Sequence, residues 1–108
     1  MPSEQPVKHK YRLQFVPSAW DEWQALDGSV KEVLRKLLKK RLDNPHVPGG
    51  ELHGALAGFY KIKLRKQGYR LVYQVENEAL IVLVLAVAKR ENRAAYQFAI
   101  ERLLTNRS

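Results

Sequence analysis

The sequence predicts an α+β fold in which about four strands form a small antiparallel sheet packed with three helices. Three patterns support this: an alternating apolar stretch near the N-terminus, an apolar stripe of period 3.6 in residues 30–42, and three strand-like segments between residues 59 and 88. The resulting order, β-α-α-β-β-β-α, is typical of helices packed against one sheet. A chain of 108 residues suffices for one domain, which we place at residues 10–108, after a flexible lead-in of residues 1–9.

The first half of the chain predicts one strand and two helices. Residues 11–16 alternate apolar and polar side chains, which is the period of a half-buried strand. Trp20 and Trp23 follow at helical spacing, so we expect both tryptophans in the core. Ser29 and Glu32 fit a capping box at the start of a second helix. The apolar stripe of that helix consists of Val30, Val33, Leu34, Leu37, Leu38 and Leu42.

The second half predicts a loop, three strands and a last helix. Residues 45–58 are rich in glycine and proline and lack periodicity, which is typical of a loop. Strands are expected at residues 59–65, 69–76 and 79–88, and their short polar connections are typical of antiparallel hairpins. The third of these strands is apolar on both faces, so it should be central or covered by helices. A helix over residues 91–104 completes the fold.

The composition is basic, with 19 Lys and Arg against 11 Asp and Glu and a formal net charge of +8. This balance favours nucleic acid, an anionic membrane surface or an acidic protein as partner, without choosing among them. The absence of cysteine excludes disulfides, thiolate metal sites and cysteine nucleophiles. Because the N-terminus has no signal-peptide pattern and the longest apolar run is too short to cross a membrane, we expect a soluble cytoplasmic protein without a membrane partner.

Basic residues gather on the first hairpin of the second half. Lys61, Lys63 and Arg65 lie on one face of the predicted strand, where they repel one another, so a polyanion would give a reason to collect them. A two-residue loop would place Arg70 opposite Lys63, whereas an odd-length loop would place it on the other face unless Gly68 formed a bulge. The alternative reading is an ordinary solvated strand face.

This set of side chains suits RNA cleavage through the neighbouring 2′-hydroxyl. The reaction needs a base, an acid, and cations for the charge that grows on the phosphate. Arginine forks match phosphate oxygens, and nearby cations favour the neutral form of a lysine, which can act as a base. An aromatic ring such as Tyr96 can stack on a base, although its position on an apolar helix face fits a core role equally well. The three histidines are scattered without metal-ligand spacing, so no metal site is expected.

Three segments are informative when taken in order: Tyr60-Lys61-Ile62-Lys63-Leu64-Arg65, Gly68-Tyr69-Arg70-Leu71-Val72-Tyr73 and Val87-Ala88-Lys89-Arg90-Glu91. Together they resemble the RelE toxin family of bacterial toxin–antitoxin systems. The resemblance covers about residues 10–104, and residues 59–96 carry most of its specificity. It implies a RelE-like, microbial-ribonuclease-type fold and a toxin that cleaves messenger RNA in the ribosomal A site without a metal or another cofactor. The implied partners are a RelB-like antitoxin, the ribosome with its 16S rRNA, and mRNA.

The resemblance also implies a role for each residue of the candidate site. Lys63 resembles the general base and Arg90 the general acid, whereas Lys61 and Arg70 would stabilise the charged transition state. Tyr96 would stack on and orient the substrate base. The other basic residues that we expect to contact RNA are Arg65, His53, Lys89, Lys36, Lys39 and Lys40. His53 stands where the family pattern has an arginine.

Two further readings compete with the ribonuclease. ParE-like relatives with the same fold inhibit DNA gyrase and are not ribonucleases, and gyrase inhibition has no need for the full basic set. A non-catalytic RNA- or ribosome-binding module is the third reading. An enzyme should lose turnover while it keeps binding when Lys63 or Arg90 is replaced, whereas a binding module should lose affinity gradually.

Overall fold

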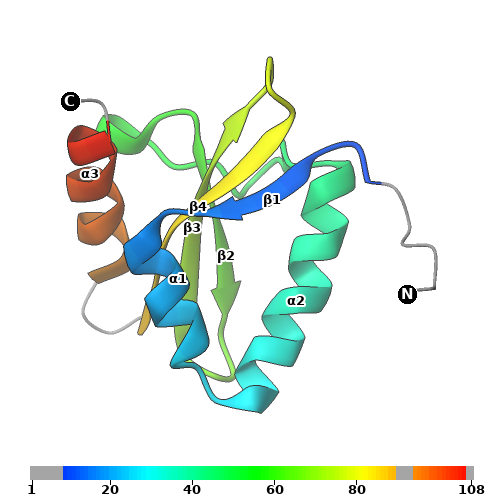
Figure 1. The fold of residues 1–108 in the computed structure, drawn as a ribbon, viewed down its shortest axis with the longest axis vertical. Helices are drawn as coiled ribbons and strands as arrows, with labels where there is room; N and C mark the ends of the chain where they lie inside the picture. Colours follow the sequence, from blue (N-terminus) through cyan, green and yellow to red (C-terminus); the bar gives the residue numbers. More distant parts are fainter. Residues whose placement is uncertain (1–8, 90–93, 107–108) are drawn as a thin grey trace.

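The computed structural model describes residues 9–89 and 94–106. Its elements, shown in Figure 1, follow the predicted order, which confirms the α+β class with three helices and four strands. They are β1 (Arg12–Phe15), α1 (Pro17–Gln24), α2 (Gly28–Asp43), the short 3-10 helix η1 (Gly54–Leu56), β2 (Phe59–Leu64), β3 (Tyr69–Glu76), β4 (Ile81–Lys89) and α3 (Ala94–Asn106).

The four strands form one sheet in the order β1-β4-β3-β2. The pairs β2–β3 and β3–β4 are antiparallel hairpins, as predicted, but β1 pairs parallel to β4, with Arg12 opposite Ile81 and Phe15 opposite Val84. The sheet is therefore mixed, and the expected antiparallel arrangement does not extend to β1. Parallel neighbours need a long crossover connection, and here the chain between β1 and β4 supplies it through two helices and a hairpin.

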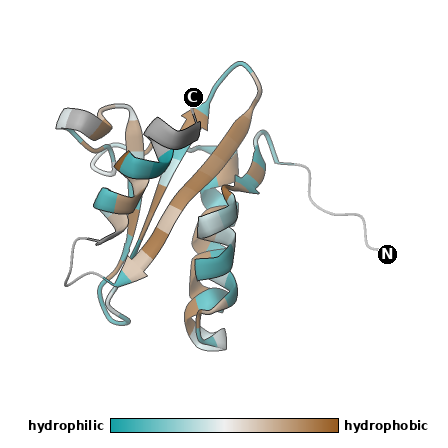
Figure 2. Cartoon of the chain, turned by 60° about the vertical axis from the view of Figure 1, so that its left-hand side comes forward, coloured by the Kyte–Doolittle hydropathy of each residue, from teal (hydrophilic) through white to brown (hydrophobic). Residues whose placement is uncertain are grey.

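Helices cover both faces of the sheet. Figure 2 shows α2 on one side of the sheet and α3 on the other, with the strongly apolar β4 between them. This arrangement confirms that β4 is a central strand, and it explains why β4 is apolar on both faces. The apolar stripe of α2 is buried at Val30, Leu34, Leu38 and Leu42. None of the helices in the described residues is both long and apolar enough to cross a membrane.

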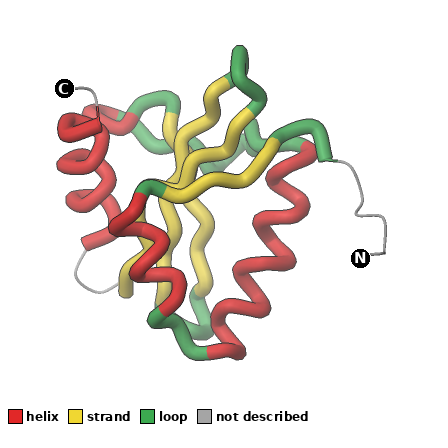
Figure 3. The backbone as a smooth tube through the Cα atoms, viewed as in Figure 1, coloured by secondary structure: helices red, strands yellow, loops and turns green. Residues whose placement is uncertain are grey.

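Helix α1 lies along β4 beyond the end of β1. There the Glu22 carboxylate accepts a hydrogen bond of 2.9 Å from the Val87 N–H, a backbone donor that β1 does not reach. A short loop joins α1 to α2 at one end of the molecule (Figure 3). Trp23 on α1 is buried with 6% of its surface exposed, whereas Trp20 is 45% exposed, so the prediction of a core role is wrong for Trp20.

The predicted capping box at Ser29 is also wrong. Helix α2 begins at Gly28, two residues earlier than a Ser29 N-cap requires, which places Ser29 inside the first turn, where its own N–H needs an acceptor. Asp27 is the N-cap, and its carboxylate accepts from the Ser29 N–H at 3.2 Å and from the Ser29 hydroxyl. These hydrogen bonds, led by the one from the hydroxyl, lower the pKa of Asp27. Glu32 instead pairs with Arg35 at 3.0 Å.

Candidate functional site

The register of the β2–β3 hairpin places Arg70 directly opposite Lys63. A four-residue turn, residues 65–68, joins the two strands, and the Gly68 N–H closes it on the Leu64 carbonyl at 2.7 Å. Gly68 has φ +75°, a left-handed conformation that suits glycine. Since the loop is even in length, Lys61, Lys63 and Arg70 share one face of the sheet. This is the first of the two arrangements that the sequence allowed, although the loop is longer than two residues.

Arg70 joins the hairpin to helix α3. Its guanidinium carbon lies 5.0 Å from the centroid of the Tyr96 ring, at a distance typical of a cation–π contact. Both side chains are half-buried. The Arg70 Nε atom is buried and has no hydrogen-bond partner among the described residues. A buried donor of this kind is normally satisfied, so the Arg70 Nε is an exception in the part of the chain that the structure describes.

The remaining predicted catalytic residue, Arg90, lies outside the described residues. Lys89, which precedes it, is exposed and pairs with Tyr69, whereas Arg70 pairs with Ala88. The Lys89 side chain therefore leaves the strand on the opposite face of the sheet from Arg70. His53 is exposed and directly precedes η1, a short helix that contacts α3.

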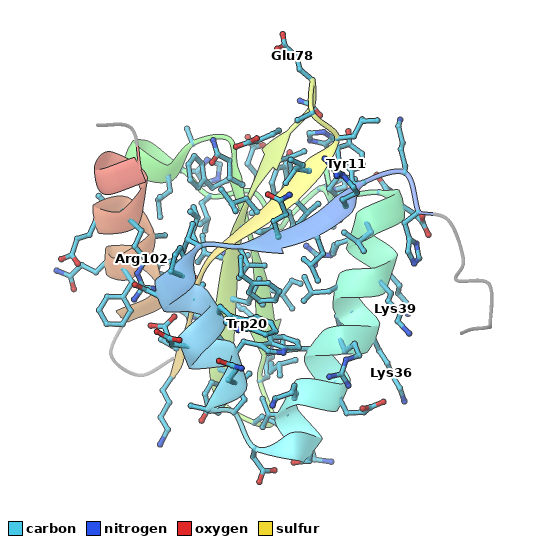
Figure 4. All side chains as sticks on the ribbon, in the orientation of Figure 1. Tyr11, Trp20, Lys36, Lys39, Glu78 and Arg102 are labelled. Atoms are coloured by element: carbon cyan, nitrogen blue, oxygen red, sulfur yellow. The ribbon has the colours of Figure 1, made fainter. Side chains whose placement is uncertain are left out.

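The basic residues of α2 do not join the hairpin cluster. Lys36, Lys39 and Lys40 are exposed, and α2 covers the face of the sheet opposite to α3, the helix that carries Tyr96. Figure 4 shows Lys36 and Lys39 extending away from the sheet. The structure thus separates the predicted RNA-binding residues into at least two surfaces.

A basic depression of about 320 Å³ lies at the edge of the sheet beside β2. Four of the residues that line it are cationic and none is acidic. The lining residues are Arg41, Val47, Pro48, Gly49, Gly50, Lys61, Lys63 and Arg65. The loop of residues 47–50 is held to the strand by a hydrogen bond of 2.9 Å from the Lys61 N–H to the Gly50 carbonyl. The depression therefore continues the Lys61–Lys63 surface around the sheet edge.

Arg41 is the residue of this depression that the sequence reasoning missed as a site residue. It extends from α2 and donates through Nη1 to the Tyr73 hydroxyl at 2.8 Å and to the Lys61 carbonyl at 3.4 Å. The helical spacing contained a signal, because Arg41 stands one turn after Leu37, at the border of the apolar stripe, where a long side chain is partly covered.

Tyr73 fixes the inner end of Arg41. Its hydroxyl accepts from Arg41 and donates to the Pro45 carbonyl at 2.7 Å, and its ring stacks on Tyr60 with centroids 5.6 Å apart. Burial raises the pKa of Tyr73 above its ordinary value, although the Arg41 contact acts in the opposite direction. The hydroxyl therefore stays protonated at neutral pH, as its donor role requires.

Arg102 attaches α3 to the rest of the fold. It donates to both carboxylate oxygens of Glu22 on α1, each at 2.9 Å, and to the Leu85 carbonyl of β4 at 2.9 Å. Its guanidinium also lies 4.7 Å from the Phe98 ring centroid. Figure 4 shows Arg102 between α3 and α1. Since Tyr96 belongs to the same helix, this attachment contributes to the position of Tyr96 over Arg70.

A second surface is apolar. A groove of about 590 Å³ lies between β1, α1 and α2, and Figure 4 shows Trp20 extending from α1 toward α2 at this place. Phe15 and Trp20 meet edge to face with ring centroids 5.2 Å apart. The groove is lined by His9, Leu13, Phe15, Trp20, Trp23, Arg35, Leu38, Lys39 and Leu42. Among the described residues, no three His, Asp or Glu side chains gather in a way that could hold a metal ion.

Comparisons with known proteins match most of the chain. A family model described as the ParE toxin of type II toxin–antitoxin system, parDE, matches residues 13–94. A RelE-like toxin protein of Escherichia coli is 48% identical over 94 residues, which cover 87% of this chain and 98% of that protein. The mRNA interferase toxin RelE of E. coli strain K12 is 44% identical with the same coverage.

Solved structures give the same picture. A double arginine-to-alanine variant of E. coli RelE in the free state superposes with a TM-score of 0.79 and 41% identity, over 87% of this chain and 98% of that one. The toxin of the intact E. coli RelBE toxin–antitoxin complex superposes with a TM-score of 0.71 and 44% identity, over 75% of this chain and 98% of that one.

Proposed function

The chain belongs to the RelE/ParE family of type II toxin–antitoxin toxins, and from this membership we propose that it is an mRNA interferase. In this proposal it is a ribosome-dependent endoribonuclease that cleaves mRNA in the ribosomal A site. The observation that carries the proposal is the pairing of Lys63 with Arg70 across one hairpin, with Tyr96 packed on Arg70. These three residues belong to the set that the family resemblance assigned to catalysis.

The reaction that we propose is attack of a 2′-oxygen on the adjacent phosphorus. Lys63 takes the proton from the 2′-hydroxyl, the 2′-oxygen bonds to phosphorus, and the bond to the 5′-oxygen breaks. Arg90 gives a proton to the leaving 5′-oxygen, an assignment that rests on the family resemblance because Arg90 lies outside the described residues. The products are a 2′,3′-cyclic phosphate and a 5′-hydroxyl. No metal or other cofactor takes part in this scheme.

Electrostatic support comes from the neighbours of Lys63. Arg70 stands directly across the hairpin, and cations close to a lysine favour the neutral form that can accept a proton. Lys61 and the guanidinium of Arg70 would donate hydrogen bonds to the phosphate oxygens as charge grows on them. Tyr96, already aligned with Arg70, would stack on a substrate base and hold the backbone in line for attack.

The residues that we expect to contact RNA lie on more than one face of the protein, which fits a substrate that contacts several of its sides. Lys36, Lys39 and Lys40 belong to α2, which lies on the side of the sheet opposite to α3, whereas Arg65 lines the basic depression. We assign these residues, with His53 and Lys89, to contacts with 16S rRNA and mRNA phosphates. A ribosomal A site presents RNA on more than one side, so contacts on two faces are compatible with it. Since ribosomes are cytoplasmic, the proposal places the protein in the cytoplasm.

The partner that we propose is a RelB-like antitoxin. E. coli RelE has been solved with its antitoxin RelB, and this chain offers an apolar surface on which a protein segment could pack. Trp20 is exposed there although its ring contacts Phe15, and Arg35 and Lys39 add positive charge to the lining. An amphipathic segment with acidic residues beside its apolar face would match this groove.

Gyrase inhibition remains the second candidate, because the matched family description names ParE. A comparison of Lys63→Ala with Arg12→Ala, which removes an exposed cation from the opposite edge strand of the sheet, distinguishes a ribonuclease from a non-catalytic binding module. For a ribonuclease, Lys63→Ala should lower single-turnover cleavage on ribosomes by about 10²–10⁴ while ribosome affinity is largely kept. Arg12→Ala should cleave at the wild-type rate. Loss of ribosome affinity without a specific loss of turnover would favour a non-catalytic binding module.

A further inference from the structure

We propose that Arg41 and the loop of residues 47–50 form a subsite for a second phosphodiester of the RNA strand, next to the one that is cleaved. The basic depression defined above shares Lys61 and Lys63 with the catalytic cluster and extends from them around the edge of β2. A strand bound over Arg70 and Lys63 can therefore continue into it. The identification of the ligand as RNA rests on the proposed function.

Hydrogen bonds to the rest of the fold hold Arg41 in this position. Nη1 makes both of its hydrogen bonds, to the Tyr73 hydroxyl and to the Lys61 carbonyl, so the guanidinium is oriented before any ligand binds. Its Nε and Nη2 atoms have no hydrogen-bond partner within residues 9–89 and 94–106. A guanidinium fixed by one nitrogen keeps further donors in the planar geometry that matches phosphate oxygens.

The surroundings of Arg41 favour an anion. Lys61, Lys63 and Arg65 line the same depression, and none of the lining residues is acidic, so the lining itself supplies no counter-charge. Lys61 and Lys63 are two residues apart on β2, about 6.7 Å along the strand. Cations spaced along an edge strand, with an arginine beside them, present a track for an extended polyanion.

Arg41 differs in this respect from the other cations of α2. Lys36, Lys39 and Lys40 are exposed, whereas Arg41 is half-buried and is held by residues of β2 and β3. We therefore expect Arg41 to bind one defined phosphate, whereas the lysines contribute positive charge without a fixed geometry.

The test is a thermodynamic cycle between Arg41 and individual phosphates. The probe is an RNA hexamer with 2′-O-methyl groups at every position, which cannot be cleaved, and a set of hexamers in which one phosphodiester at a time is a neutral methylphosphonate. Affinities are measured for the wild-type protein, Arg41→Ala, Arg41→Lys and the control Arg12→Ala. One methylphosphonate position should weaken wild-type binding about tenfold and should have no further effect in Arg41→Ala.

A role of Arg41 in stability alone predicts a different pattern. If Arg41→Ala only loosens the fold, it will weaken all hexamers by the same factor, and this uniform loss would overturn the subsite. Absence of hexamer binding by the folded wild-type protein would overturn it too. Should Arg41→Ala fail to fold, Arg41→Lys decides, because it keeps the charge and loses the fork: the effect of the same methylphosphonate should shrink but not vanish. Arg12→Ala should reproduce the wild-type pattern.

Failure of the subsite and failure of the proposed function give different results. Position-specific coupling to Arg41 with no cleavage on ribosomes would keep the phosphate subsite and remove the ribonuclease. Cleavage on ribosomes without coupling at any position would keep the ribonuclease and remove the subsite.

Discussion

Replacing Arg102 by methionine should loosen helix α3 from the sheet. Methionine keeps an aliphatic stem of similar length over Phe98 but removes the two hydrogen bonds to Glu22 and the one to the Leu85 carbonyl. Glu22 would then keep only the Val87 N–H as a donor among the contacts seen here. The change therefore isolates the polar attachment of α3 from its apolar packing.

The size of the effect follows from how far the ion pair is buried. The side chains of Arg102 and Glu22 are 19% and 22% exposed, so the pair lies between a surface and a buried salt bridge. Breaking a buried pair costs about 3–5 kcal/mol, whereas exposed pairs contribute about 0–1 kcal/mol. We expect Arg102→Met to lower the free energy of unfolding by about 2–3 kcal/mol, which for a chain of this size lowers Tm by roughly 10–20 °C.

The assay is urea unfolding of the wild-type protein, Arg102→Met, Glu22→Gln and the double variant. Glu22→Gln should cost less, because its amide oxygen can still accept from the Val87 N–H. The losses in free energy of unfolding of the two single variants should add up to about 1–2 kcal/mol more than the loss of the double variant, since both single changes remove the same contact. A cost below about 0.5 kcal/mol for Arg102→Met, with no coupling to Glu22, would refute the idea that this pair holds α3 in place.

Three further changes test other parts of the structure. Gly68→Ala should lower the free energy of unfolding by about 1–2 kcal/mol, since alanine is strained at φ +75°, and an unchanged urea midpoint would contradict the turn geometry. Burial raises the pKa of Tyr73 in the folded state, so the protonated Tyr73 hydroxyl contributes fully to stability below about pH 10, and this contribution is lost as the pH rises further. Tyr73→Phe should therefore make the free energy of unfolding fall less steeply at alkaline pH. Trp20→Ala should weaken binding of the cognate antitoxin by about 2 kcal/mol with little change in Tm, and equal affinity in titration calorimetry would remove the apolar groove from the interface.

Local patterns in the sequence were enough to predict most elements of this fold. The alternation in β1, the apolar stripe of α2 and the doubly apolar β4 each report their own environment through side-chain spacing, and all three predictions agree with the structure. The parallel pairing of β1 with β4 was missed, because pairing between distant strands depends on the path of the intervening chain. The N-cap was predicted at Ser29, two residues after the actual N-cap Asp27, because both side chains can cap a helix.

In the candidate site, too, local spacing predicted some positions, whereas others depended on the folded chain. The shared face of Lys61 and Lys63 follows from strand period alone, but the position of Arg70 required the length of the turn, which the sequence left open. Arg41 could not be assigned from its own helix, where it is one cation among several. Its position in the basic depression depends on Tyr73 and Lys61, which are distant in sequence and contact it only in the folded chain.

The central claim is cleavage of mRNA by the cluster of Lys63, Arg70 and Tyr96. It is tested most directly by mapping the 3′ ends of an mRNA held on ribosomes with a defined A-site codon, after incubation with the purified protein. We predict cleavage within that codon that leaves a 2′,3′-cyclic phosphate, is lost in Arg70→Ala and is retained in Arg12→Ala. An mRNA that stays intact in the presence of folded wild-type protein would contradict the claim and make gyrase inhibition the first alternative to test.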